Sequence, residues 1–304
     1  MSNTMKENKM GTMPVNKLLI NMALPMMISM LVQALYNIVD SIFVARISEE
    51  ALTAVSMAFP MQNLMIGVAG GVGVGTNALL SRALGEGRHE EADKMAVHGI
   101  FITACSYIIF LAIGLFFARE FFVIQGANEV IADYGYDYLS VILIVSFGCL
   151  FQMIFERLLQ ATGRTFYSMI TQGTGAIINI ILDYLFIFVF KWGMFGAALA
   201  TSLGYIIGAL MILYYLTRSG NVIHLVRFKL SRKSLQLTAR NVGYMCRLGA
   251  STFLCEGAIA TMMFVGNYVF ISYLGEDGVA AYSIACYFFP IIFMVYNAIA
   301  QSAQ

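Results

Sequence analysis

The stretch LVQALYNIVDSIFVARI, residues Leu31–Ile47, is the most informative part of this sequence. Most of its residues are apolar, as in a helix that crosses a lipid bilayer, yet it carries Gln33, Asn37 and Asp40 near its centre. A carboxylate in the middle of a membrane costs about 3 kcal/mol even on the most lenient insertion scale, so it normally faces protein or water and has a function. The rest of the sequence indicates what that function is.

The overall composition is that of a polytopic, all-α membrane protein. Of the 304 residues, 60% are hydrophobic and 12% are charged, whereas a soluble domain has about 25% charged residues. The net charge of +1 and the absence of a concentrated basic face exclude nucleic acid as a partner. Neither CxxC nor HExxH occurs in the sequence, so we expect no cofactor and no catalytic metal.

Apolar runs divide the chain into about eight transmembrane helices. A bilayer core needs about 20 apolar residues per helix, and short polar segments separate runs of at least that length. We place the spans at 17–46, 51–82, 94–117, 134–159, 167–190, 195–217, 247–274 and 278–304.

The basic residues predict how these spans are oriented. Fifteen of the 18 lysines and arginines lie in segments on the side of the N-terminus, and only Arg46, Arg119 and Lys191 lie on the other side. Because cytoplasmic loops carry the excess of Lys and Arg, the N-terminus and the basic segment 218–247 are expected in the cytoplasm. We therefore expect a multi-pass protein of the plasma membrane. In a bacterium with two membranes, this is the inner membrane.

An internal repeat connects the two ends of the chain. A shift of 227 residues places DSIFVARISEEALTAVSMA (Asp40–Ala58) on NYVFISYLGEDGVAAYSIA (Asn267–Ala285), with five identities. Since six spans separate the copies, the repeat is parallel, an architecture known in secondary transporters. We expect a complete six-helix lobe at 1–217, a cytoplasmic basic linker at 218–246, and the first two helices of a second lobe at 247–304. Four helices of that second lobe would then be missing.

Polar residues in the fifth and sixth spans are expected to share a pocket with Asp40. Asn179 and Asp183 are four residues apart, on one face of a helix, and Thr201 lies near one end of the next span. Two carboxylates, an amide oxygen and a hydroxyl suit a hard cation such as Na⁺, or equally a proton. Hydrogen bonding between helices is the structural alternative, and it applies least to the two aspartates. Glu256 is a third acid within an apolar run.

The motifs of the chain resemble those of the multidrug and toxic compound extrusion (MATE) transporters. The resemblance runs from LPMMISMLVQALYNIVDSIFVARI through AFPMQNLMIGVAGGVGVGTNALLSRALGEGRHEEADK to ERLLQATGR and NIILDYLFIF. It implies two six-helix lobes around a V-shaped cavity that opens alternately to each side, with drug efflux driven by entry of H⁺ or Na⁺. This chain would then be a family member truncated after its eighth helix.

The resemblance also implies residue roles. The cation site of the first lobe in this family has an aspartate on helix 1, an asparagine and an aspartate on helix 5, and a threonine on helix 6. In this sequence these match the residues already grouped by spacing, Asp40, Asn179, Asp183 and Thr201.

Four further residues are weaker candidates for contact with the substrate or for coupling. Gln33, Tyr36 and Asn37 lie on helix 1 close to Asp40. Glu256 resembles an acid that one branch of the family carries on helix 7.

The leading hypothesis is a cation-coupled antiporter, driven by H⁺ or Na⁺, that exports small amphipathic and often cationic compounds. A flippase for lipid-linked saccharides is the nearest alternative, although its cavity should be more basic. An intramembrane protease is not expected, because GxGD and HExxH are missing, so the chain is not interpreted as an enzyme. A fragment that does not transport is a third alternative, favoured by the incomplete second lobe.

Overall fold

The computed structural model describes residues 13–217, 223, 232–286, 296, 298–300 and 302. All regular elements within these residues are helices, which confirms the all-α prediction. They are α2 (Val15–Ala45), α3 (Glu49–Gly85), α4 (His89–Phe116), α5 (Ala118–Ile124), α6 (Glu129–Ile144), α7 (Phe147–Ala161), α8 (Thr165–Asp183), the π-helix η1 (Tyr184–Val189), α9 (Gly193–Thr217) and α10 (Arg232–Cys286).

The described residues contain six helices that are long and apolar enough to cross a membrane, and a seventh span in two pieces. The fourth predicted span, 134–159, corresponds to α6 and α7, which meet at an angle of 46°. A kink without proline commonly arises at Gly and Ser, and here Ser146 and Gly148 flank the break. Of the eighth predicted span, 278–304, the structure describes residues 278–286, which belong to α10, together with 296, 298–300 and 302.

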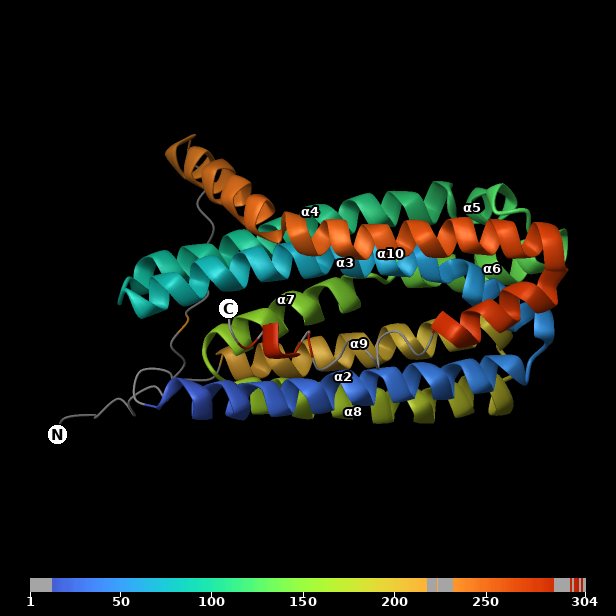
Figure 1. Ribbon diagram of the computed structural model, residues 1–304, viewed down its shortest axis with the longest axis horizontal. Helices are drawn as coiled ribbons and strands as arrows, with labels where there is room; N and C mark the ends of the chain where they lie inside the picture. The colour runs from blue at the N-terminus through green and yellow to red at the C-terminus, as the bar shows by residue number, and fades with distance from the viewer. Residues whose placement is uncertain are drawn as a thin grey trace.

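The turns between helices alternate between the two ends of the bundle. Figure 1 shows the start of α2, the α3–α4 turn and the α7–α8 turn at one end, and the α2–α3 turn and the start of α9 at the other. This is the alternation that successive membrane crossings predict. It places α2, α8 and α9 next to each other, and these three helices carry the candidate site.

The repeat is visible in the helix boundaries. Ser48 caps α3, because its hydroxyl oxygen accepts a hydrogen bond of 3.1 Å from the backbone N–H of Ala51. The residue 227 positions later is Gly275, where α10 is interrupted by a left-handed backbone with φ of 70°. Glycine tolerates that conformation without steric cost. Both copies of the repeat therefore break their helix at the same point.

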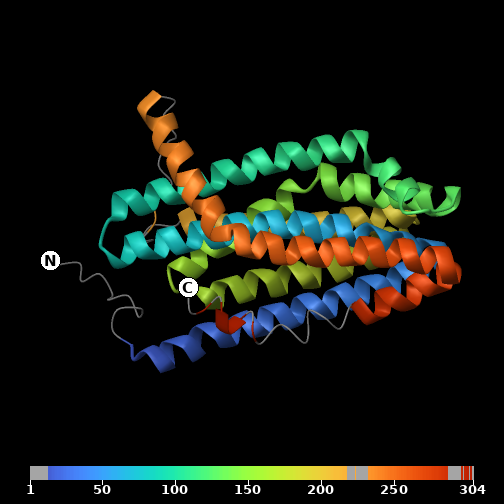
Figure 2. The ribbon, with the colours of Figure 1, turned by 45° about the horizontal axis from the view of Figure 1, so that its top comes forward.

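A long contact joins the first lobe to α10, which lies beside α3 (Figures 1 and 2). The backbones approach closely at Gly71 and Gly249, because a Cβ atom on Gly249 would clash with the carbonyl oxygen of Gly71. Nearer the Gly275 break, Asn267 is buried and donates hydrogen bonds of 3.3 Å to the carbonyl oxygen of Ser56 and to the side chain of Gln125. Small residues and buried amides thus hold these helices together, as is typical of membrane proteins.

The second half of the expected linker, from Arg232 onward, is helical and continues directly into the seventh span. It is held against α4 by His98, a buried residue whose two ring nitrogens lie 3.1 Å from the hydroxyl of Thr238 and the amide nitrogen of Asn241. Residues 218–222 and 224–231 of the linker lie outside the described residues.

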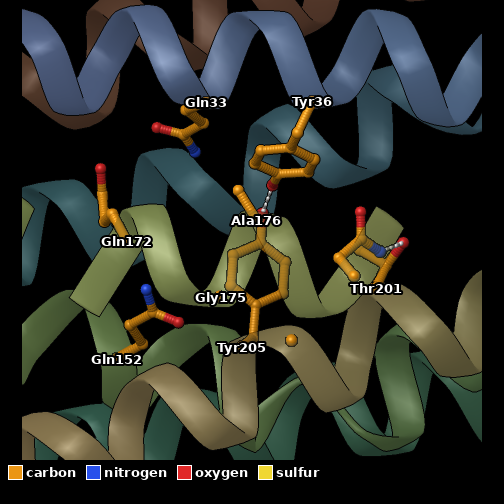
Figure 3. A pocket seen from close by; sticks show the side chains of 10 residues that line it. Gln33, Tyr36, Gln152, Gln172, Gly175, Ala176, Thr201 and Tyr205 are labelled. Atoms are coloured by element: carbon orange, nitrogen blue, oxygen red, sulfur yellow. Dashed lines mark hydrogen bonds between the residues drawn. The ribbon is translucent and has the colours of Figure 1, made fainter. Parts of the chain in front are cut away.

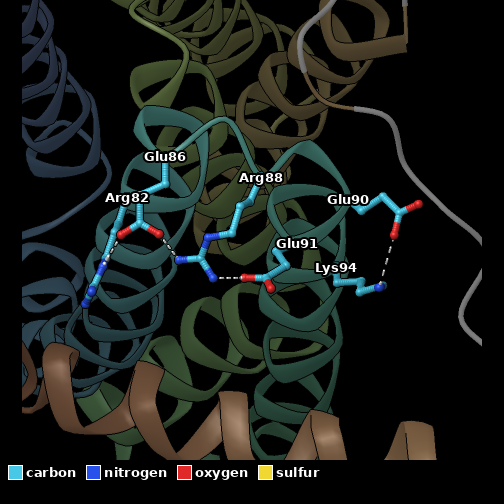
Figure 4. Close-up of polar contacts among 6 residues, drawn as sticks. All are labelled: Arg82, Glu86, Arg88, Glu90, Glu91 and Lys94. Carbon is cyan, nitrogen blue, oxygen red and sulfur yellow. Dashed lines mark hydrogen bonds and ion pairs between the residues drawn. The ribbon is translucent and has the colours of Figure 1, made fainter.

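The exposed α3–α4 turn is ordered by charged side chains (Figure 4). Glu86 accepts a hydrogen bond of 2.9 Å from Arg82 and another from Arg88, and these contacts lower the pKa of the Glu86 carboxyl group. Arg88 also pairs with Glu91. Exposed pairs of this kind contribute little stability each, so their effect is to fix the geometry of the turn.

Candidate ion and substrate site

Close approach of α8 and α9 brings the polar residues of the fifth and sixth spans together. A Cβ atom on Gly204 would lie 3.1 Å from the carbonyl oxygen of Gly175, a tight contact, so glycine allows the closest approach at this crossing. One turn further along, Asn179 of α8 lies next to Thr201 of α9. The pattern of small residues therefore determines how near the two side chains can lie.

Asp40 of α2 and Asp183 of α8 bring their carboxyl groups into direct contact. Asp40 is 6% exposed and Asp183 is fully buried. One oxygen of each, Oδ1, accepts no hydrogen bond from the residues that the structure describes. Asp183 is also the last residue of α8 before the π-helical turn η1, and such turns occur frequently at functional sites.

The amide of Asn179 connects this pair to α9. With its nitrogen facing Asp183, Asn179 donates a hydrogen bond of 3.3 Å to Asp183 Oδ2 and accepts one of 3.1 Å from the backbone N–H of Thr201. In the opposite orientation the nitrogen lies 3.3 Å from Thr201 Oγ1. Either way, the four residues that the sequence grouped form one continuous cluster.

The cluster has the chemistry of a cation or proton site. Two buried carboxylates in contact cannot both stay charged unless a cation compensates them. None of the five ion pairs formed by the described residues includes Asp40 or Asp183. A monovalent cation would find oxygen ligands only, and a proton could be shared between the two carboxyl groups. The described residues contain no group of three His, Cys, Asp or Glu side chains that could hold a transition metal.

Asp40 lines a cavity of about 130 Å³. Gln33, Asn37, Thr201 and Tyr205 line the same cavity. Asp183 is not among its lining residues, so Asp40 is the member of the carboxyl pair that faces this cavity. We refer to it as the aspartate cavity.

The hydroxyl groups of Tyr36 and Tyr205 form a hydrogen bond of 2.7 Å from α2 to α9. Figure 3 shows Gln33 and Tyr36 projecting from α2 toward α8 and α9, with Tyr205 reaching up to meet Tyr36. Tyr36 was a weak candidate from sequence, and the structure places it next to the cluster.

A second, larger cavity of about 380 Å³ adjoins the first. It is lined from α2, α3, α7, α8, α9 and α10, and Gln33, Asn37 and Tyr205 line both cavities. Glu256, the acid expected on helix 7, is half-buried and lines this larger cavity rather than the aspartate cavity. We refer to it as the glutamate cavity, because Glu156 also lines it.

Four residues of this region were missed from sequence. Gln152, Glu156, Gln172 and Tyr205 all line the glutamate cavity. Gln152 and Glu156 have the same i, i+4 spacing that marked Asn179 and Asp183. That spacing alone is a weak signal here, because Glu156 lies near the expected end of a span, beside Arg157.

Comparison with known proteins identifies relatives of the chain. The sequence model of the MatE family matches residues 25–185. The chain is 26% identical over 273 residues to the multidrug export protein MepA of Staphylococcus aureus, an alignment that covers 90% of the chain and 59% of MepA. The chain thus spans about 59% of the length of this relative.

Solved structures agree with the fold. A MATE family transporter in an outward-facing conformation superposes with a TM-score of 0.82 and 29% identity, covering 99% of this chain and 66% of the other. An inward-facing MATE transporter gives a TM-score of 0.80 and 28% identity, covering 89% of this chain and 60% of the other.

Proposed function

Because the chain belongs to the MatE family of multidrug and toxic compound extrusion transporters, we propose that it acts in cation-coupled antiport that exports small amphipathic, often cationic, compounds. It would do so as a multi-pass protein of the plasma membrane with its N-terminus in the cytoplasm. It would move its substrates without chemical change, needing no cofactor besides the coupling ion, H⁺ or Na⁺.

The contact between Asp40 and Asp183 is the observation that carries this proposal. A cation or proton that enters the aspartate cavity would offset one of the two negative charges of the pair and remove most of the repulsion between α2 and α8. Loss of the ion would restore that repulsion. The ion therefore binds one arrangement of α2 better than the other, which is the condition for shifting a conformational equilibrium.

The Tyr36–Tyr205 hydrogen bond offers a way to transmit this change. It joins α2 to α9, and Tyr205 lines both cavities. A shift of α2 that breaks the bond would alter the wall of the glutamate cavity. Ion binding in the aspartate cavity would thereby change the affinity of the glutamate cavity for substrate.

The charges of the glutamate cavity favour export of cations over flipping of a lipid-linked saccharide. Its charged lining residues within the described chain are Glu156, Glu256 and Arg157. A site for a diphosphate-linked lipid would need several cationic groups directed at the phosphates.

Transport into vesicles under imposed gradients tests the proposal. The purified chain is reconstituted in liposomes loaded with ethidium, and a pH gradient or a Na⁺ gradient is applied separately. We expect one of the two gradients to make ethidium transport faster than in protein-free liposomes. An ionophore that collapses that gradient should abolish the effect. No response to either gradient would contradict antiport.

A further inference from the structure

Glu156 of α7 is a buried acid outside the Asp40–Asp183 pair. It is 7% exposed and lines the glutamate cavity, whereas Asp40 lines the aspartate cavity. Figure 3 shows two of the neighbouring side chains, Gln152 on α7 and Gln172 on α8, on the same side of the view.

Two glutamine amides hold the carboxyl group of Glu156. Gln152 Nε2 lies 3.2 Å from Glu156 Oε1, and Gln172 Nε2 lies 2.9 Å from Glu156 Oε2. Each amide donates to a different oxygen, and an ionised carboxylate can accept both hydrogen bonds. Gly208 of α9 leaves the space for this arrangement, since a Cβ atom there would lie 2.6 Å from Gln152 Oε1.

Neutral amides satisfy the hydrogen bonds of Glu156 but supply no positive charge. Arg157 is its neighbour in sequence, but its Nη1 donates to Gln160 at 3.0 Å. No ion pair among the described residues includes Glu156. Arg157 lines the same cavity, but successive residues on a helix point about 100° apart, so its guanidinium group acts on Glu156 at a distance and not through an ion pair. A buried carboxylate without a directly paired counter-ion is costly, and here it lines a cavity that can admit one.

We propose that Glu156, held by Gln152 and Gln172, is the counter-ion for the positively charged group of an organic cation bound in the glutamate cavity. The site is separate from the ion site at Asp40 and Asp183. The proposal deepens the proposed function and rests on it only for the statement that the bound cation is also the exported compound.

The cavity has the size and lining for such a ligand. Its volume of about 380 Å³ lies within the range of about 300–1,000 Å³ that holds drug-sized molecules. Met26, Met30 and Met153 line it, and their flexible, polarizable side chains can pack against apolar groups of different shapes. An amphipathic cation would place its charge at Glu156 and its apolar groups against these methionines.

The shared wall explains how the two sites would communicate. Gln33 and Tyr205 line both cavities. A cation at Glu156 and a cation at the aspartate pair would therefore repel each other across this wall. Entry of the coupling ion would weaken substrate binding, which is the relation that exchange requires.

Binding of tetraphenylphosphonium to the purified chain, with no gradient present, tests the site. This cation has no N–H group, so its affinity reports on charge and apolar contact. We expect Glu156→Gln to weaken its binding at least about tenfold, or about 1.4 kcal/mol, and Glu156→Asp to weaken it less. The neutral analogue triphenylphosphine oxide should bind both variants as it binds the wild type. Glu129→Gln, which changes an exposed acid outside both cavities, is the matched control.

A second measurement on the wild type avoids any folding defect of the variants. Carbodiimide modification of Glu156, mapped by mass spectrometry, should be blocked by tetraphenylphosphonium and not by triphenylphosphine oxide. Unchanged affinity in folded Glu156→Gln, or no protection of Glu156, would overturn the proposal.

The two proposals fail in different ways. If Glu156 is required for tetraphenylphosphonium binding but neither gradient drives ethidium transport, the site stands and the antiport proposal fails. If a gradient drives transport while Glu156→Gln binds like the wild type, antiport stands and the site fails.

Discussion

The hydroxyl groups of Tyr36 and Tyr205 lie 2.7 Å apart, and their hydrogen bond ties α2 to α9 at the wall between the aspartate and glutamate cavities. Asp40 lies one turn further along α2 from Tyr36. A movement of α2 relative to α9 would therefore strain or break this bond.

Removal of either hydroxyl should loosen the connection. Tyr36→Phe and Tyr205→Phe should each lower the free energy of unfolding by about 0.5–1.5 kcal/mol, because each leaves the other hydroxyl without its partner. The double variant should lose less than the sum of the two single losses. Denaturant unfolding in mixed micelles measures all three values. Strictly additive losses would show that the hydrogen bond contributes nothing.

The crossing of α3 and α10 should tolerate no added volume. Gly249→Ala places a methyl group in a clash with the carbonyl oxygen of Gly71, so the helices must separate, at a cost of about 1–3 kcal/mol for overpacking. Gly257→Ala, on the same helix with no heavy atom within 4 Å of the added carbon, is the matched control. It should be neutral or stabilising, since alanine favours helix by up to about 1 kcal/mol over glycine. Equal melting temperatures for the two variants would contradict the packing described.

The positions of the first seven spans could be predicted from sequence because a long apolar run is a local signal. The break between α6 and α7 could not, because hydropathy records composition and not direction. The tripeptide Ser146–Phe147–Gly148 within the run was the available signal. The helical second half of the linker was also missed, since its polar composition hides a helix that is held by a contact with the distant residue His98.

The grouping of Asp40, Asn179, Asp183 and Thr201 could be predicted because helical spacing and a family resemblance pointed to the same residues. Their role in ion coupling stays a prediction. Glu156 was missed because its partner Gln172 lies on another helix, 16 residues away. Tyr205 was missed for a similar reason, because its partner is 169 residues away in the chain. Such pairs come together only when the helices pack. A single sequence does not show which helices contact each other.

The most direct test of the account is ethidium transport by Asp40→Asn in the gradient-driven liposome assay. The substitution keeps the size and polarity of the side chain but removes the charge from the carboxyl pair, so the coupling ion loses half of its site. We expect transport to fall at least about tenfold, the factor that about 1.4 kcal/mol of lost ion binding produces, with unchanged reconstitution. Asp137→Asn, an exposed residue outside both cavities, should transport like the wild type. Undiminished gradient-driven transport by Asp40→Asn would contradict the central claim.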